Sequence, residues 1–277
     1  MLQISGLYIY PIKSLAGIAV KEAEVTATGF KHDRRWMLVD VNNRFISQRE
    51  VPQLALLQVA IEQGALRVTD KVKGDSIAIP FKSSGVETTV TIWDDNCTGE
   101  YVSKEIDEWF TAMLSLNCRL VYMPDTSKRL VDQRYAPGNA ITSFSDAYPF
   151  LIIGQASLND LNSRLGEALP INRFRPNMVF TGGEPYEEDL FAHFKIGDIN
   201  FYGVKLCDRC VMTTIDQNSL AKAKEPLKTL AEYRKKNNKI LFGQNLVHDG
   251  DGVVAIGDHL QIISINHEER FIINQAI

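Results

Sequence analysis

Two cysteines lie close together in the segment Cys207-Asp208-Arg209-Cys210. The segment follows an apolar stretch that ends at Leu206. An arginine beside a thiolate favours the charged form, which lowers the pKa of a thiol and promotes metal ligation. Soft thiolates suit soft or high-valent metals, but the spacing by itself does not identify the metal.

Three other interpretations of this spacing stay open. A structural zinc site normally needs four ligands, and the five histidines are scattered, with no second CxxC. A thioredoxin-like dithiol would open a helix after a strand. Here Thr213, Thr214 and Ile215 follow, and these residue types are poor helix formers. The third alternative is a pair of ordinary structural cysteines.

Further segments carry cationic side chains that could bind an anion. They are Lys13-Ser14 after Pro11, Asp33-Arg34-Arg35-Trp36, and Arg173-Phe174-Arg175-Pro176-Asn177. Arginine presents a planar fork suited to phosphate, while lysine acts as a point charge. Taken singly, each group is more often a surface charge or a structural ion pair, and sequence spacing does not show that they converge.

Composition and missing motifs argue against several classes of protein. The formal net charge is −4, so no basic face for a nucleic acid is expected. No signal peptide and no apolar run of membrane-spanning length are visible, and the four cysteines are sparse. We therefore expect a cytoplasmic protein without membrane association. Walker, GxGxxG, HExxH and GxSxG motifs are absent from the sequence.

The first half of the sequence is predicted to be rich in short strands. Alternation and turn residues place them at 2–10, 21–27, 35–40, 44–47, 56–61, 65–69, 76–80 and 87–93. Strands this short and closely spaced suggest a barrel or sandwich. A helix is predicted over 100–116 and a strand over 119–123. Residues 124–147 form a long polar connection, which in a compact domain is usually functional or a linker.

The second half mixes both kinds of element. Residues 149–153 form a short apolar run. Strands are predicted at 177–181, 194–206, 253–256 and 259–265, and helices at 156–165 and 225–236, with Pro226 in the first turn of the last helix. Strands and helices do not alternate regularly. The pattern therefore predicts an α+β fold rather than a doubly wound α/β sheet.

Eight segments, in this order, resemble the MOSC family of molybdenum-cofactor proteins. YPIKSLAG at 10–17, DRRWMLVD at 33–40 and FISQRE at 45–50 are similar to its N-terminal β-barrel domain. FSDAYPFLI at 144–152, NRFRPNMVF at 172–180, LCDRCVMTTID at 206–216, EPLKTL at 225–230 and FGQNLV at 242–247 are similar to the MOSC domain. The resemblance implies a β-rich N-terminal domain over 1–120 and a MOSC β-barrel domain with peripheral helices over 121–277.

The resemblance also implies a molybdopterin-type cofactor in a cleft between the two domains. Cys207, the first cysteine of the CxRC motif, would be the metal ligand, and the role of Cys210 stays open. The residues that would hold the pterin and its phosphate are Lys13, Ser14, Arg34 and Arg175, with Ser145 and Asp146 near the metal and Ala147 and Leu206 contacting through backbone groups. Asp146 would handle a proton or orient the substrate; alternatively it is an ordinary turn carboxylate.

Among relatives of this kind are the mitochondrial amidoxime-reducing components and bacterial reductases of N-hydroxylated compounds. The resemblance implies two-electron reduction of an N–O bond in a small N-hydroxylated molecule. No cysteine follows Cys210, so no iron–sulfur cluster is expected in this chain and electrons would come from a separate flavoprotein or ferredoxin-like donor. Pyridoxal phosphate binding and detoxification are further family associations. The alternatives are a non-catalytic molybdenum-cofactor or sulfur carrier, with Cys207 as a persulfide, and a structural or interaction protein.

Serine substitution of the two cysteines separates these readings. Cys207→Ser should abolish N-reduction and disturb the metal while the fold survives, because serine is a poor ligand for a soft site. Cys210→Ser should do less. A dithiol predicts equal damage from both, and structural zinc predicts impaired folding in both. The measurements are the activity, metal content and melting temperature of the two variants. An active Cys207→Ser variant together with an inactive Cys210→Ser variant would contradict the assignment of Cys207 as the metal ligand.

Overall fold

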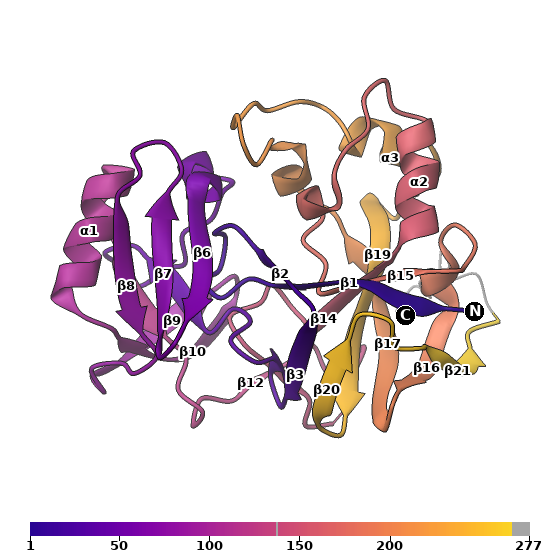
Figure 1. The fold of residues 1–277 in the computed structure, drawn as a ribbon, viewed down its shortest axis with the longest axis horizontal. Coiled ribbons are helices and arrows are strands. Elements are labelled where there is room, and N and C mark those ends of the chain that lie inside the picture. Colours follow the sequence, from indigo (N-terminus) through magenta and orange to yellow (C-terminus); the bar gives the residue numbers. More distant parts are fainter. Residues whose placement is uncertain (137, 268–277) are drawn as a thin grey trace.

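The largest sheet takes strands from both ends of the sequence. The computed structural model describes residues 1–136 and 138–267, so residue 137 and the last ten residues of the predicted second domain lie outside it. Along this nine-stranded sheet the order is β2 (Ile18–Val20), β1 (Gln3–Ile9), β15 (Met178–Thr181), β14 (Phe150–Gly154), β19 (Lys239–Asp249), β17 (Ile199–Asp208), β16 (Phe191–Ile196) and β21 (Gln261–Ile265), with β18 (Lys235–Lys236) paired to β19. It forms the larger of two lobes, on the right in Figure 1.

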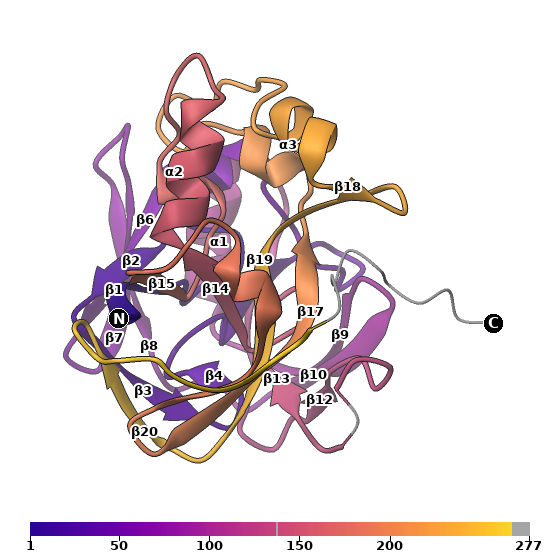
Figure 2. The same ribbon diagram turned by 90° about the vertical axis from the view of Figure 1, so that its right-hand side faces the viewer.

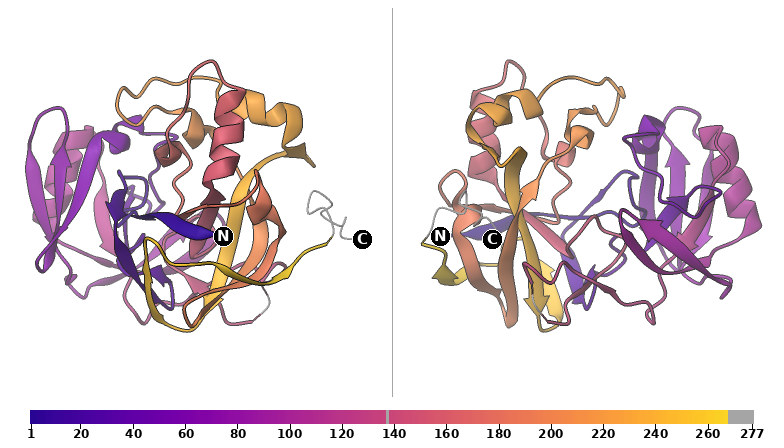
Figure 3. Two further views of the ribbon diagram at one scale, coloured as in Figure 1. Left: turned by 45° about the vertical axis from the view of Figure 1, so that its right-hand side comes forward. Right: turned by 180° about the vertical axis from the view of Figure 1, so that it is seen from behind.

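The smaller lobe is built from the first half of the chain. One sheet has the order β5 (Trp36–Val39), β11 (Arg119–Tyr122), β10 (Asp95–Tyr101) and β9 (Glu87–Ile92), and another has β6 (Leu57–Glu62), β7 (Ala65–Asp70) and β8 (Ser76–Pro80). Helix α1 (Lys104–Leu114) begins at Ser103, whose side chain accepts a hydrogen bond from the Ile106 amide. Its Ile106 and Phe110 are buried in the core of this lobe. Both lobes remain distinct when seen from behind in Figure 3.

Smaller elements complete the architecture. They are β3 (Glu22–Thr26), β4 (Gly29–Phe30), β20 (Gly252–Ala255), β12 (Arg129–Leu130), β13 (Ile141–Thr142), α2 (Gln155–Ser163), α3 (Leu227–Tyr233), and 3₁₀ turns at Pro52–Leu56, Ile171–Arg173, Glu187–Leu190 and Val211–Thr214. Figure 2 shows α2 and α3 together at one end of the large sheet. Leu158 and Leu161 of α2 and Leu230 of α3 join one apolar cluster with Ile153 and Phe242 of the strands beneath.

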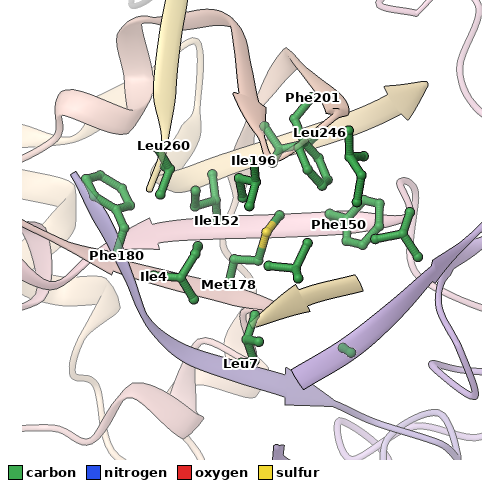
Figure 4. Close-up of a cluster of buried hydrophobic side chains, with 14 of the residues drawn as sticks. Ile4, Leu7, Phe150, Ile152, Met178, Phe180, Ile196, Phe201, Leu246 and Leu260 are labelled. Carbon is green, nitrogen blue, oxygen red and sulfur yellow. The ribbon is translucent and has the colours of Figure 1, made fainter. Parts of the chain in front are cut away.

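The core of the larger lobe explains why the first strand belongs to it. Ile4 and Leu7 of β1 are buried against Met178 and Phe180 of β15 and Ile152 of β14, as Figure 4 shows. Burial alternates along most of β1, as expected for a strand with one covered face. The fold is α+β, with a curled nine-stranded sheet in the larger lobe and a β-rich smaller lobe. The proposed boundary at residue 120 remains a prediction, and in space β1 and β3 pair with β15 and β20.

Most predicted elements are present, and the errors have physical causes. The segment 44–47 forms only isolated bridges, at Arg44 and Phe45, so the predicted strand there is wrong. The predicted strand over 194–206 is two strands, β16 and β17, because Gly197 adopts a φ of 57° in the turn between them. The helix predicted over 225–236 is shorter, and Pro226 precedes its first residue.

Several strands have no predicted counterpart, and the two longest of them, β10 and β19, lack a strand signature in their sequences. Strand β10 reads DNCTGEY, and it forms because β9 pairs with it in register from Asp95 to Glu100. The predicted helix over 100–116 therefore starts later, at Lys104. Strand β19 lies between β14 and β17 and is buried over Leu241–Gln244, so neither face alternates clearly. In the part of the chain that is described, no helix combines the length and apolarity needed to cross a membrane.

A buried carboxyl beside α2 predicts a pH-dependent stability. Glu188 is fully buried, and its Oε2 atom accepts a hydrogen bond from Ser157. Its Oε1 atom has no hydrogen-bond partner among the described residues. Burial, with the neighbouring Asp189 charge, raises the pKa of Glu188 to about 7. The pKa of Glu188 is higher in the folded protein than in the unfolded chain. Its contribution to the free energy of unfolding is therefore fully present at acidic pH and is lost as the pH rises through about 7.

Replacing Glu188 with its neutral isostere should remove this loss. Glu188→Gln should raise the free energy of unfolding above pH 7 by roughly 2–3 kcal/mol and flatten its dependence on pH between about 5 and 8. Urea denaturation across that range measures both. Glu167→Gln, at an exposed position, is the matched control and should behave like the parent protein. An unchanged pH slope in Glu188→Gln would show that the buried carboxyl does not ionise on this range.

Candidate functional site

A pocket of about 210 Å³ brings the predicted site residues together. Lys13, Ser14 and Arg34 reach it from the first part of the chain, and Arg175 and Cys207 reach it from the larger lobe. Eight of the nine predicted residues line it: Lys13, Ser14, Arg34, Ser145, Asp146, Ala147, Arg175 and Cys207. The ninth, Leu206, is buried within β17 and its side chain does not line the pocket.

The pocket lining is strongly cationic. It contains six basic side chains, Lys13, Arg34, Arg173, Arg175, Lys205 and Arg209, against two carboxylates, Asp146 and Asp208. A concave site lined mainly by one sign of charge concentrates ligands of the opposite sign. Arg35, by contrast, donates to the Met123 carbonyl and pairs with Asp125 outside the pocket, so it is a structural arginine.

Cys207 presents its thiol near the end of β17, with Arg209 as its partner. The Nη1 atom of Arg209 donates to Cys207 Sγ over 3.0 Å, and Nη2 donates to the Phe174 carbonyl over 2.6 Å. Burial raises the pKa of the Cys207 thiol, and the Arg209 charge opposes that shift. The thiol is therefore held protonated by its surroundings, while the cation that would stabilise a thiolate is already in place.

The surroundings of the two cysteines bear on the other interpretations. Both Cys207 and Cys210 are free thiols. Among the residues described, no three or more histidine, cysteine or acidic side chains are grouped to hold a metal, as structural zinc would require. The motif leads into a single 3₁₀ turn over Val211–Thr214 rather than an α-helix, unlike the arrangement a thioredoxin-like dithiol would have.

Three of the pocket residues hold an unusual backbone conformation. Ser14, Arg34 and Arg175 have φ angles of 68°, 49° and 54°, in the left-handed region that favours glycine. Such conformations cost free energy and persist where the surrounding contacts enforce them, most often at functional sites. At Ser14 the enforcing contact is the buried Gln48, whose amide donates to the Ser14 carbonyl over 2.6 Å.

Tyr10, which no motif singled out, contacts both predicted site arginines. The guanidinium carbons of Arg34 and Arg175 each lie 4.2 Å from the centroid of the buried Tyr10 ring. Both cations therefore interact with the same π system. Arg34 pairs with Asp33 at 2.6 Å, and Arg175 donates to the Leu15 carbonyl over 2.8 Å. Burial lowers the pKa of Arg175 to about 10, so it stays cationic at neutral pH.

Lys13 and Asp146 form the second charged feature of the pocket. Lys13 Nζ lies 2.6 Å from Asp146 Oδ1 and donates to the Phe144 carbonyl over 2.8 Å. Burial lowers the pKa of Lys13 to about 8, although Asp146 opposes the shift. Desolvation in the pocket would raise the pKa of Asp146, but the charge and hydrogen bond of Lys13, together with the charges of Arg49 and Arg34, outweigh it and hold that pKa well below its usual range. Asp146 is therefore a carboxylate held by an ammonium group, rather than by backbone amides.

Some residues that organise the site carry no sequence signal of their own. Gln48 and Gln217, far apart in the chain, exchange two side-chain hydrogen bonds of 3.2 and 3.0 Å, and both are buried. Arg129 holds the segment that carries Asp146 and lies in the long polar connection. Tyr10 lies inside the segment YPIKSLAG, directly after β1, and this position is the sequence feature that could have pointed to its role in the pocket.

Comparison with known proteins decides the family. The model of the MOSC N-terminal beta barrel domain matches residues 1–117, and that of the MOSC domain matches residues 139–261. The chain belongs to the MOSC family. Mitochondrial amidoxime-reducing component 1 from mouse and from human are 30% and 31% identical to it, over 94% of this chain and 82% of each relative. Molybdenum cofactor sulfurase from Arabidopsis thaliana is 34% identical over 90% of this chain, which spans only 33% of that protein.

The arginine of the MOSC motif should set the reactivity of Cys207. Arg209→Ala removes the cation that opposes the raised pKa of the thiol, so the thiolate fraction at neutral pH should fall. In cofactor-free Cys210→Ser protein, alkylation of Cys207 by iodoacetamide at pH 7.5 should slow by roughly three- to tenfold. Arg209→Lys, which keeps the charge, is the matched control, and its alkylation rate should lie between those of the parent protein and Arg209→Ala. Equal rates in all three proteins would contradict a role for Arg209 in thiol ionisation.

Proposed function

We propose that this MOSC protein is a molybdenum-cofactor-dependent reductase of N-hydroxylated compounds. The observation that carries the proposal is one pocket in which a free thiol, Cys207, faces cations from both parts of the chain. Similarity to the mitochondrial amidoxime-reducing components over 94% of this chain supports the same reading.

The pocket residues fit a phosphate-bearing cofactor with a soft metal. A thiol is the ligand type that such a metal prefers, and arginines are the side chains best suited to phosphate. Among the described residues none accepts a hydrogen bond from the buried Nε atom of Arg209, so the site holds a donor that this part of the chain does not use. The strained backbone of Arg34 and Arg175 is a second sign of a site built for a ligand.

Each residue then has a defined part in holding the cofactor. Cys207 would ligate the metal, and Arg34 and Arg175, fixed by Tyr10, would hold the phosphate and the polar edge of the pterin. Lys13 and Ser14 would contribute from the segment between the lobes, and Ser145 from the loop beside Asp146. Ala147 and Leu206 would contribute backbone groups, which suits Leu206 because its side chain lies outside the pocket lining.

The overall reaction takes two electrons and two protons and converts a hydroxylamine or amidoxime into an amine or amidine plus water. The bound cofactor supplies the redox chemistry. Lys13 Nζ, with a pKa of about 8, holds a proton close to the working pH and can donate it to the departing oxygen. Asp146 keeps Lys13 charged and oriented, because its own pKa is too low for it to act as the acid.

The partners follow from the same proposal. A small N-hydroxylated molecule is the substrate, and a separate flavoprotein or ferredoxin-like protein is the electron donor. Within the described chain the other two cysteines, Cys97 and Cys118, are buried in the smaller lobe, where burial raises both pKa values to about 11. A cytoplasmic location belongs to the proposal as well.

The similarity to molybdenum cofactor sulfurase favours one second candidate function. A non-catalytic carrier of the cofactor or of sulfur would use the same pocket, with Cys207 as a persulfide or transfer thiol. Such a carrier predicts cofactor or sulfur on the protein without turnover. Sustained reduction of an N-hydroxylated substrate by a chemically reduced artificial donor distinguishes the enzyme from the carrier.

Metal analysis with a substrate panel tests the proposal. Protein from cells with an intact molybdenum-cofactor pathway should hold about one molybdenum per chain and should reduce N-hydroxylated compounds. Loss of one charge-assisted bond to phosphate, roughly 1.5–3 kcal/mol, should weaken cofactor retention about tenfold or more in Arg34→Ala and in Arg175→Ala. Arg44→Ala, an exposed arginine paired with Glu50, is the control.

The possible outcomes are distinct. Stoichiometric zinc without molybdenum would refute the cofactor assignment. Molybdenum without turnover on any N-hydroxylated compound would leave the carrier function. Unchanged occupancy in both pocket variants would show that Arg34 and Arg175 are structural cations only.

A further inference from the structure

A buried arginine outside the predicted site holds the loop that carries Asp146. Arg129 belongs to β12, and its side chain is only 5% exposed. It pairs with Asp95 at 2.7 Å, and donates to the carbonyl oxygens of Ser143 at 3.1 Å, Ser145 at 2.7 Å and Asp146 at 3.3 Å. One guanidinium therefore binds three carbonyl groups of a four-residue stretch.

Lys13 binds the remaining carbonyl of that stretch. Its Nζ atom donates to the Phe144 carbonyl over 2.8 Å, so the four successive carbonyl groups of residues 143–146 all accept bonds from two buried cations. The hydroxyls of Thr142 and Ser145, 2.6 Å apart, add a further constraint. The backbone of this stretch thus has little freedom to turn.

The orientation of the carbonyl groups decides where the amides point. In a planar trans peptide the carbonyl of one residue and the amide of the next point in opposite directions. The carbonyls of residues 144–146 are each directed at Lys13 or Arg129, so the N–H of each following residue points away from the cation that binds that carbonyl. These following residues, Ser145, Asp146 and Ala147, line the pocket, and in the described chain none of their amides donates a hydrogen bond.

We propose that Arg129 is a positioning residue that presents three successive backbone amides to an anionic oxygen in the pocket. Consecutive N–H groups in such a concavity bind phosphate and similar oxyanions. The inference rests on the proposed function for the identity of the ligand, an anionic cofactor, but not for the orientation of the amides. The Asp95 pair anchors Arg129 from the β9–β10 hairpin, which couples the smaller lobe to the pocket.

A merely structural arginine would affect stability without affecting these amides. Asp95 is 51% exposed, and a pair of that kind adds little to stability. The carbonyl bonds are therefore the interactions whose loss should matter. Lysine at position 129 keeps the charge but cannot reach Asp95 and three carbonyls at once, because it has one nitrogen in place of a planar fork.

Inorganic phosphate is the probe, added to cofactor-free full-length protein while the amide resonances are followed by NMR. Phosphate should shift the resonances of Ser145, Asp146 and Ala147 in the parent protein. Arg129→Ala should weaken that binding at least tenfold, and Arg129→Lys should restore part of it. Arg134→Ala, an 82% exposed arginine on the same connection, is the matched control and should bind as the parent does. Cofactor retention by the loaded protein should follow the same order.

The outcomes separate this inference from the proposed function. Parent-like phosphate shifts in both Arg129 variants, or shifts confined to other amides, overturn the inference even if the protein is an active molybdenum enzyme. Phosphate shifts that require Arg129 in a protein that never takes up molybdenum uphold the inference and refute the proposed function. If Arg129→Ala does not fold, Arg129→Lys and Asp95→Asn test the inference instead. Each of these two variants should bind phosphate more weakly than the parent protein while its melting temperature stays unchanged.

Discussion

The pairing of β1 with β15 is the constraint on which the rest of the site depends. Ile4 and Leu7 anchor the first strand in the core of the larger lobe, far in sequence from the strands they contact. The chain leaves that strand at Tyr10, packs Ile12 and Leu15 into the core of the smaller lobe, and returns to the large sheet as β2, which pairs with β1. Lys13 and Ser14 lie on this connection, so their position beside residues 144–146 follows from where β1 is held.

The site concentrates like charge, and the protein holds it together with specific internal contacts. Arg34 and Arg175 both contact the Tyr10 ring, and Asp33 and Asp146 each pair with one cation. Backbone carbonyl groups accept hydrogen bonds from Lys13, Arg34, Arg173, Arg175 and Arg209. Left-handed backbone at three residues of the site adds strain. Charge repulsion and strain of this kind are expected to be relieved by an anionic ligand, because its binding supplies the missing counter-charge.

The pKa of the Cys207 thiol is likewise set by two opposing effects. Burial keeps Cys207 neutral, and Arg209 works in the opposite direction at a distance of 3.0 Å. A thiol must lose its proton to ligate a metal, so the protein environment sets how strongly a metal must compete with that proton. A neutral thiol is also less reactive towards oxidants than a thiolate, which suits a residue that lines an open pocket.

The sequence by itself was sufficient for the family, the α+β class and most strands, because these are carried by local patterns and short motifs, and it singled out the thiol and the main cations that the structure brings together. It did not reveal β10 and β19, which form only because neighbouring strands pair with them. The roles of Tyr10, Gln48 and Arg129 also depend on partners distant in the chain. Tertiary structure alone decided that Lys13, Arg34, Arg175 and Cys207 face one pocket, since convergence of side chains is a property of how strands pair and pack, and no spacing along the chain encodes it.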